Sequence, residues 1–276
     1  MAMDNPAYTR NKGFTASKGT LSAAELQAMY DASPNTVTRS GGGSNTVAET
    51  PMSIEGAVGK SVGLFAVLVV GAVVGWVLTS SNHELGTKMM FGAMIIGFVL
   101  AMVNIFKKEP SPALIMAYAV VQGFFLGVIS FVYNSQWDGI VLQAVLATLT
   151  IVGVTLALFA SGKVRASAKA TKVFMISMVG YLVFSLINMM LVSFGAIDNP
   201  WGVRGFEIFG IPLGALIGVF AILLGAYSLV LDFDFIQKGV VNQIPAKYEW
   251  TGAFGIMVTV IWLYLEMLRL LAITRN

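Results

Sequence analysis

The sequence predicts an all-α integral membrane protein, a seven-transmembrane-helix bundle. Of its 276 residues, 57% are hydrophobic and only 11% are charged, whereas about 25% of the residues are charged in a typical soluble domain. The mean hydropathy of +0.79 is correspondingly high. Seven apolar stretches supply this excess, each close to the ~20 residues that a helix needs to cross a bilayer. The composition therefore excludes an ordinary soluble domain and a disordered chain.

The seven predicted spans follow one another through short connections, so that successive helices should lie antiparallel. Each span is an apolar run that ends where charged residues, glycine or proline appear. We place the spans at Ser61–Thr79, Lys88–Phe106, Pro112–Tyr133, Gly139–Ala160, Lys172–Gly195, Ile211–Ile236 and Trp250–Ala272.

Residues 1–58 differ in composition from the rest of the chain and are expected to form a flexible cytoplasmic tail, with residues 59–276 as the transmembrane domain. Within the tail, Ser22-Ala23-Ala24-Glu25 has the pattern of a capping box that opens a short helix through Ala32. This helix is either transient or an element that docks on the bundle. Segment 33–50 has a flexible linker composition. Because no apolar run precedes residue 61, we expect the first span to act as an uncleaved anchor.

The basic residues predict how the chain is oriented in the membrane. Cytoplasmic loops of membrane proteins carry an excess of Lys and Arg. The loops after the odd-numbered spans hold two such residues, Lys88 and Arg204. The loops after the even-numbered spans hold eight: Lys107, Lys108, Lys163, Arg165, Lys169, Lys172, Lys238 and Lys247. We therefore expect the N-terminus in the cytoplasm and the C-terminus outside.

The residue inventory argues against an enzyme and against a resident cofactor. The chain has no cysteine and one histidine, His83, so thiolate metal sites and paired-histidine zinc sites cannot form. It also lacks a phosphate-binding glycine–lysine loop and a nucleophile placed with a histidine base. We therefore expect a non-enzymatic protein with no cofactor, and no nucleic-acid partner.

Ionisable residues inside the spans are few, and each is a functional candidate because a charge in hydrocarbon is costly. Asp232 and Asp234 lie near the inner end of the sixth span. Being two residues apart on a helix, they point in roughly opposite directions. Asp234 has Lys238 four residues on, the favourable order for an ion pair. Asp232 has no such cation, so we expect it to face the bundle core, either as a titratable functional group or as a protonated carboxyl hydrogen-bonded between helices.

The seventh span contains Glu266 and Arg269, which are three residues apart and share a helix face. We expect them to neutralise each other near the outer interface. Counted along the helices, Glu266 should lie roughly 16 Å from Asp232 in depth. The two carboxyls can then border one ion pathway, for which Asp234 is a further candidate, but they cannot share a proton. Gln122 and Asn188 add neutral polar groups in the third and fifth spans.

Glycines at four-residue spacing predict close packing between helices. The spacing occurs at three places, namely Gly71 and Gly75, Gly123 and Gly127, and the series Gly210, Gly214 and Gly218. We interpret these glycines as packing positions without a chemical role.

The chain resembles the Bax inhibitor-1 family in several segments. Three of them look like the last two helices of that family: 231–236 (LDFDFI), 247–250 (KYEW) and 262–271 (WLYLEMLRLL). The third helix of the family resembles the pattern Pro112, Tyr118, Gln122-Gly123 and Leu126-Gly127. With its seven spans and long tail, the chain is most similar to a bacterial subgroup with an extended N-terminal tail.

This resemblance implies a bundle with a central seventh helix, wrapped by two layers of three helices. It also implies a pH-sensitive calcium leak in a bacterial cell membrane. In the family, carboxylates of the sixth and seventh helices share a proton or bind the cation. An arginine of the second helix acts as a latch by binding to these carboxylates. Asp232 falls on the first carboxylate, whereas Thr259 stands at the second. Gln122 replaces a glutamate of many relatives, and the second span has no internal arginine.

Two functions from different classes remain. The first is a calcium or cation leak with Asp232 as the pH gate and as a weak, transient metal ligand, since calcium takes about six or more oxygen ligands. The second is a non-conducting regulatory membrane protein that binds protease or stress-response partners. A cavity connected to Asp232 would favour the leak, and a packed core around it the regulatory function. Apart from the lipid bilayer and such membrane-protein partners no partner is expected, and the oligomeric state stays open.

Overall fold

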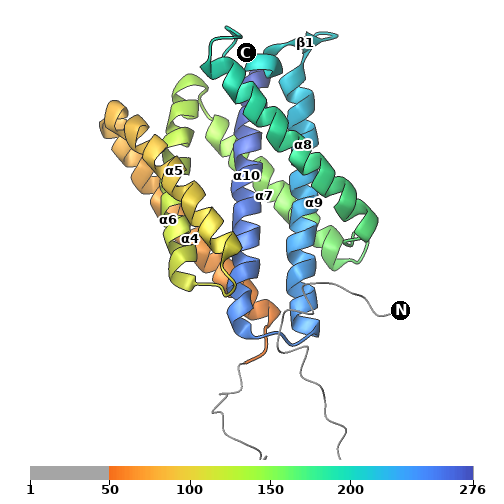
Figure 1. The fold of residues 1–276 in the computed structure, drawn as a ribbon. Coiled ribbons are helices and arrows are strands. Elements are labelled where there is room, and N and C mark those ends of the chain that lie inside the picture. Colours follow the sequence, from red (N-terminus) through yellow and green to blue (C-terminus); the bar gives the residue numbers. More distant parts are fainter. Residues whose placement is uncertain (1–49, 276) are drawn as a thin grey trace, which may run out of the picture. The chain divides into compact units, whose positions relative to one another are not determined.

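The computed structural model describes residues 50–275, and all seven predicted spans are helices in it (Figure 1). They are α4 (Ile54–Ser81), α5 (His83–Phe106), α6 (Pro112–Gln136), α7 (Ile140–Ala160), α8 (Ala168–Ser193), α9 (Leu213–Val241) and α10 (Glu249–Arg275). Each is long and apolar enough to cross a membrane. The all-α multi-pass membrane fold is therefore confirmed.

The largest difference from the predicted spans is at the start of the first helix. α4 begins at Ile54 because the Ser53 side chain accepts a hydrogen bond from the Gly56 backbone N–H and thereby caps the helix. Residues 54–58 are therefore part of the first helix, so that this helix begins before the predicted end of the tail near residue 58. The predicted short helix at 22–32 and the linker up to residue 49 lie outside the described residues.

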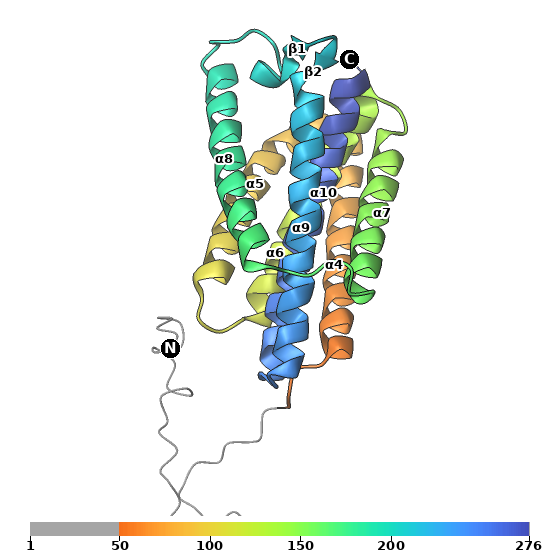
Figure 2. The same cartoon turned by 90° about the vertical axis from the view of Figure 1, so that its right-hand side faces the viewer.

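α10 is the central helix of the bundle (Figures 1 and 2). It packs against α4, α6, α7 and α9. Of an apolar stretch of 18 residues in this helix, 56% is buried inside the bundle, compared with 6% for the corresponding stretch of α8. Helices α4, α5 and α6 pack on one another on one side of it, while α9 packs against α7 and α8 on the other. This arrangement agrees with the central seventh helix and the two three-helix layers that we expected.

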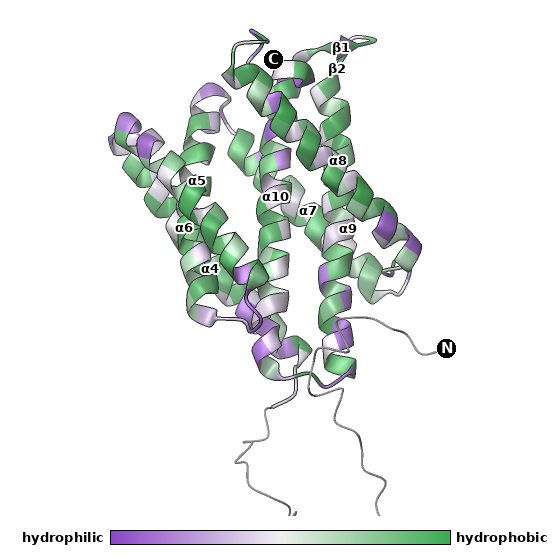
Figure 3. Cartoon of the chain, in the orientation of Figure 1, coloured by the Kyte–Doolittle hydropathy of each residue, from purple (hydrophilic) through white to green (hydrophobic). Residues whose placement is uncertain are grey.

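The surface of the bundle changes in polarity along its long axis. Apolar residues cover the middle of the helices, and polar residues gather at both ends (Figure 3). Large apolar side chains are exposed in every layer, for example Val70, Phe98, Leu142 and Ile176. Such exposure is expected where lipid rather than water surrounds the helices. We call the end of the bundle with the α9–α10 turn the lower end and the opposite one the upper end, as in Figure 1.

Glycines bring α4 and α6 into backbone contact. A Cβ atom on Gly71 would lie 2.7 Å from the Val120 carbonyl oxygen, and one on Gly123 would meet the Leu68 carbonyl oxygen. Gly75 and Gly127 make equivalent approaches, so both predicted pairs are packing positions. Gly210, however, lies outside the helix, between the two strands of a hairpin, where its φ is +76°.

The lower end is closed by the segment that precedes α4. The Met52 N–H donates to the Ile244 carbonyl at 2.7 Å, and the Ala246 N–H donates to the Thr50 carbonyl at 2.8 Å. Glu249, the first residue of α10, accepts from the Ser53 backbone N–H at 2.8 Å and pairs with Lys60 at 2.7 Å. These bonds fix the start of α4 to the turn between α9 and α10.

The upper end carries the only long connection within residues 50–275. After α8, the chain forms a short 3₁₀ helix, η1 (Gly202–Gly205), and a hairpin of β1 (Glu207–Ile208) and β2 (Ile211–Pro212) before α9 begins. Asn188 of α8 holds η1 in place: its side-chain oxygen accepts from the Val203 N–H at 2.7 Å, and its amide donates to the Trp201 carbonyl at 3.1 Å. This connection therefore folds back onto the bundle.

Candidate functional site

Asp232 of α9 lies against the central helix, as the sequence predicted. Its Oδ2 accepts a hydrogen bond from the Thr259 hydroxyl of α10 at 2.8 Å. The Thr259 hydroxyl is also 3.2 Å from the Ser228 hydroxyl, one turn before Asp232 on α9. A Cβ atom on Gly255 would lie 2.6 Å from Asp232 Oδ1, so glycine leaves room for the carboxyl there. We call Asp232, Thr259 and Ser228 the lower cluster.

The lower cluster contains a carboxyl without a counter-charge. Among residues 50–275, no Lys, Arg or His forms an ion pair with Asp232, and its one side-chain hydrogen bond comes from a neutral hydroxyl. Thr259 is only 5% exposed. An ionised carboxylate in such a place loses its hydration and gains no opposite charge, which is unfavourable. The geometry is therefore suited to a protonated carboxyl or to one that meets a mobile cation.

Asp234 does not belong to this cluster. It pairs with Lys238 at 2.6 Å, and the Lys238 side chain is 68% exposed. Asp234 thus lies on a different face of α9 from Asp232 and has a local, solvated cation, as its spacing predicted. Its place in the predicted ion pathway is not supported by any contact with Asp232 or Thr259 among residues 50–275.

A second group of polar residues surrounds Glu266 near the upper end. Glu266 is 2% exposed, and its Oε1 accepts from Arg269 Nη1 at 2.5 Å and from the Tyr181 hydroxyl of α8. The predicted pair of Glu266 and Arg269 therefore forms. The Tyr181 hydroxyl also accepts from both Arg269 at 3.1 Å and Arg204 at 3.2 Å. We call these four residues the upper cluster.

Arg204 belongs to the connection after α8, as the sequence predicted, but its burial was not predicted. η1 directs its side chain inward, where it is 4% exposed and lies 3.9 Å from Glu266 Oε2. Its Nη2 also donates to the Ser185 hydroxyl at 2.9 Å. Asn188, predicted as a supporting polar residue, acts here by holding the backbone of η1. Helical spacing in the sequence could not reveal that Arg204 lies beside Glu266, because Arg204 belongs to a loop.

Some buried polar atoms of the upper cluster lack a hydrogen-bond partner. Two of its buried atoms, Arg204 Nη1 and Glu266 Oε2, have no hydrogen-bond partner within the described part of the chain. Two guanidinium groups face one carboxylate, which leaves one excess positive charge. The cluster connects α8, η1 and α10, and so ties the least buried helix to the most buried one.

The two clusters are closer in depth than the sequence suggested. Thr259 and Glu266 are seven residues apart on α10, a rise of about 10 Å, compared with the predicted separation of roughly 16 Å. They still have different partners, so the prediction that the two carboxyls do not share a proton is consistent with the geometry. Gln122 belongs to neither cluster, since it faces Gly97 of α5.

The described residues offer no ready-made metal site. No three side chains among His, Asp and Glu come together within residues 50–275. Asp232, Thr259 and Ser228 provide few side-chain oxygens, fewer than the six to eight that calcium takes. The lower cluster is closely packed, since Thr259 is 5% exposed and a Cβ atom on Gly255 would lie 2.6 Å from Asp232 Oδ1.

Comparison with known proteins agrees with the fold and with the motifs. No curated protein is significantly similar to the chain. The sequence model of the family described as Bax inhibitor 1 like matches residues 5–276, which include all seven membrane helices and both clusters. The chain therefore belongs to the Bax inhibitor 1 like family.

Proposed function

We propose that this multi-pass membrane protein is a pH-sensitive leak for cations, calcium among them, and that Asp232 is its titratable gate. The observation that supports the proposal is the isolation of Asp232, a carboxyl on the central helix interface with a hydroxyl partner and no basic side chain among residues 50–275. Carboxylates inside a membrane usually belong to ion or proton pathways. The proposal gives the protein a transport function and no enzymatic one.

The pH dependence follows from the surroundings of Asp232. In acid its carboxyl is protonated and neutral, and the hydrogen bonds of the lower cluster hold α9 against α10. When the pH rises, the carboxyl ionises in a place without a counter-charge, which favours entry of a cation. Cation flux should therefore be low in acid and increase as the pH rises.

The cluster suits brief rather than stable binding of a cation. The carboxylate of Asp232 and the hydroxyls of Thr259 and Ser228 can act as ligands, and water must supply the remaining ones. Few protein ligands mean low affinity, and an ion that passes through a membrane must also leave its site. Calcium is therefore a transported substrate in this proposal, and no bound cofactor is involved.

The test is calcium uptake into proteoliposomes that contain the full chain, measured from mildly acidic to mildly basic pH. The wild type should show uptake that increases with pH, and Asp232→Asn should remove that dependence. Asp234→Asn is the matched control, since it changes a carboxyl two residues away that pairs with Lys238. Uptake equal to that of empty liposomes at every pH would refute the leak. Uptake with an unchanged pH profile in Asp232→Asn would refute the gate.

A gain-of-function variant sharpens this test. Thr259→Asp places a second carboxyl where the Thr259 hydroxyl now lies 2.8 Å from Asp232 Oδ2. Two carboxyls at this distance titrate as a pair with two apparent steps. We expect stronger calcium binding and a second step in the pH profile of uptake. A single step identical to that of the wild type would mean that position 259 does not take part.

A second function, regulatory binding of membrane-protein partners without conduction, is favoured by one observation. The lower cluster is closely packed, with Thr259 5% exposed and no space for a Cβ atom on Gly255. If uptake is absent while the protein is folded, this function takes the place of the leak. Co-purification with partners from membranes, compared between the wild type and Asp232→Asn, would then be the next measurement.

A further inference from the structure

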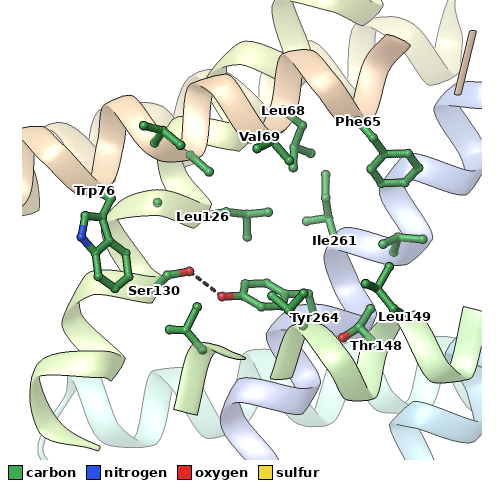
Figure 4. A pocket seen from close by; sticks show the side chains of 16 residues that line it. Phe65, Leu68, Val69, Trp76, Leu126, Ser130, Thr148, Leu149, Ile261 and Tyr264 are labelled. Atoms are coloured by element: carbon green, nitrogen blue, oxygen red, sulfur yellow. Dashed lines mark hydrogen bonds between the residues drawn. The ribbon is translucent and has the colours of Figure 1, made fainter. Parts of the chain in front are cut away.

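An apolar pocket lies in the side of the bundle, and no residue of either cluster lines it (Figure 4). Its walls are α4 and α7, and residues of α6 and α10 form its floor. The cavity measures about 340 Å³, within the range of small-molecule sites. Six residues that define its outline are Phe65, Trp76, Leu126, Val145, Leu149 and Ile261. The pocket opens between α4 and α7 toward the surface that faces lipid.

The chemistry of the pocket excludes ions and favours hydrocarbon. Ser130 of α6 and Tyr264 of α10 bring hydroxyls to it, but these hydroxyls bond to each other at 2.6 Å (Figure 4). The Thr148 hydroxyl donates to the Ala144 carbonyl at 2.7 Å. The remaining lining side chains are apolar, apart from the indole N–H of Trp76. An apolar cavity of this kind stays dry and takes up apolar molecules.

The depth of the pocket matches one leaflet of a bilayer. Its lining on α7 runs from Val141, in the first turn of the helix, to Leu149, a rise of about 12 Å. Half of a 30 Å hydrocarbon core is about 15 Å. Trp76 lies toward the upper end, near the end of α4 at Ser81, and tryptophan is typical of the membrane interface. The pocket therefore extends from the upper interface toward the middle of the membrane.

We propose that this pocket is a binding site for one acyl chain of a membrane lipid. The rim is continuous with the lipid-facing surface, since Val69, Val73 and Leu149 are each more than half exposed. Lipid chains are therefore the molecules that meet the opening, and an unfilled space of this size would forfeit many packing contacts. The headgroup stays at the upper interface, and the chain lies along the floor.

The bound chain touches the central helix next to the lower cluster. Ile261 of the floor is two residues from Thr259 on α10 and is 4% exposed. Tyr264, also in the floor, is 9% exposed. Lipid at the outer surface of the bundle cannot reach these side chains, and a chain inside the pocket contacts both. Contact of a lipid chain with Ile261 and Tyr264 therefore reports whether the pocket is occupied, and it does so independently of any result on ion flux.

The test is photochemical labelling of the full chain in nanodiscs that contain a phospholipid with a diazirine at the end of one acyl chain. Mass spectrometry then locates the labelled residues. We expect labels on Ile261 and Tyr264, in addition to labels on lipid-facing residues throughout the bundle. Val145→Trp should fill the pocket from the α7 wall and reduce the labelling of the floor several-fold. Leu146→Trp is the matched control, because Leu146 is 56% exposed and does not line the pocket.

A second variant protects the test against misfolding. Ala72→Leu fills the same space from the α4 wall, and it should reduce labelling of the floor as Val145→Trp does. Thermal unfolding verifies that each variant is folded. The proposal is overturned if the floor residues of the folded wild type stay unlabelled, or if both filling variants leave their labelling unchanged. It is also overturned if the variant Val69→Cys, in a chain without other cysteines, forms a disulfide with a second copy in liposomes, which would make a protein–protein contact the occupant of the pocket.

Discussion

The lower and upper clusters place a carboxyl on the same central helix interface but surround it differently. Asp232 has a threonine hydroxyl as its partner and no basic residue among those described. Glu266 has Arg269, Arg204 and Tyr181 around it, and is almost completely buried. The comparison teaches that burial alone does not assign a role to a carboxyl in a membrane. The partners decide whether its charge is fixed or can change.

A carboxylate between two arginines is the counter-charge of both, so its removal would leave two guanidinium groups unpaired. The upper cluster is therefore a structural junction of α8, η1 and α10. A carboxyl beside a hydroxyl can gain or lose a proton without breaking an ion pair. In the proposed function, the lower cluster is therefore the part of the bundle on which a change in pH acts.

The largest effect is expected when Glu266 is neutralised. Glu266→Gln leaves two buried or half-buried guanidinium groups without an opposite charge, and removal of one partner from a buried pair costs about 3–5 kcal/mol. Thermal unfolding in lipid nanodiscs should show a large loss of stability or a failure to fold. The matched control is Glu84→Gln, which breaks an exposed pair with Lys88 and should leave the stability unchanged. Equal behaviour of both variants would contradict a buried structural junction.

The next effect is the coupling between Glu266 and Arg269. In a double-mutant cycle of Glu266→Gln and Arg269→Gln, we expect a coupling energy of about 1–3 kcal/mol, as for residues in one ion-pair network. The double variant should nevertheless stay less stable than the wild type, because Arg204 remains buried without a counter-charge. Additive losses would show that the two residues do not interact.

Asp232→Asn should change the stability much less than Glu266→Gln. Its amide oxygen can still accept the hydrogen bond from Thr259, so we expect a change of about 1 kcal/mol or less. Chemical or thermal unfolding in the same nanodiscs would measure it. A loss as large as that of Glu266→Gln would mean that Asp232 carries a fixed charge with an essential partner, and the contrast between the clusters would disappear.

The smallest effect is expected for Asp234→Asn. It removes an ion pair with an exposed lysine, and such pairs contribute about 0–1 kcal/mol. The stability should stay within about 0.5 kcal/mol of the wild type. A clearly larger loss in thermal unfolding would place Asp234 in the core of the bundle after all.

Much of this picture could be predicted from the sequence, for physical reasons that differ between elements. The seven helices follow from apolar length alone, since only a helix of such length satisfies its backbone inside a membrane. The ion pair of Asp234 with Lys238 and that of Glu266 with Arg269 follow from helical spacing. The contact of Asp232 with α10 follows from its lack of a local cation, and the resemblance to the family singled out Thr259.

The contacts that could not be predicted from the sequence are those that helical spacing does not reveal. Arg204 reaches Glu266 only because η1 folds inward, which requires a positive φ at Gly202 and the hydrogen bonds of Asn188. Tyr181 lies in α8, an apolar helix that faces lipid on most sides, and nothing in the sequence indicates that its hydroxyl reaches Glu266. The start of α4 at Ile54 combines the local cap by Ser53 with a hydrogen bond from the Ser53 N–H to Glu249, which is 196 positions away. Ser228, in contrast, could have been found, since it lies one turn before Asp232.

The most direct test of the contrast is an infrared pH titration of the protein in nanodiscs, which detects the carbonyl stretch of protonated carboxyl groups. The account predicts a band that disappears as the pH is raised and that is absent from Asp232→Asn, but present in Asp234→Asn. A wild-type band that persists unchanged in Asp232→Asn, or the absence of any titrating band, would contradict the assignment of Asp232 as the titratable group.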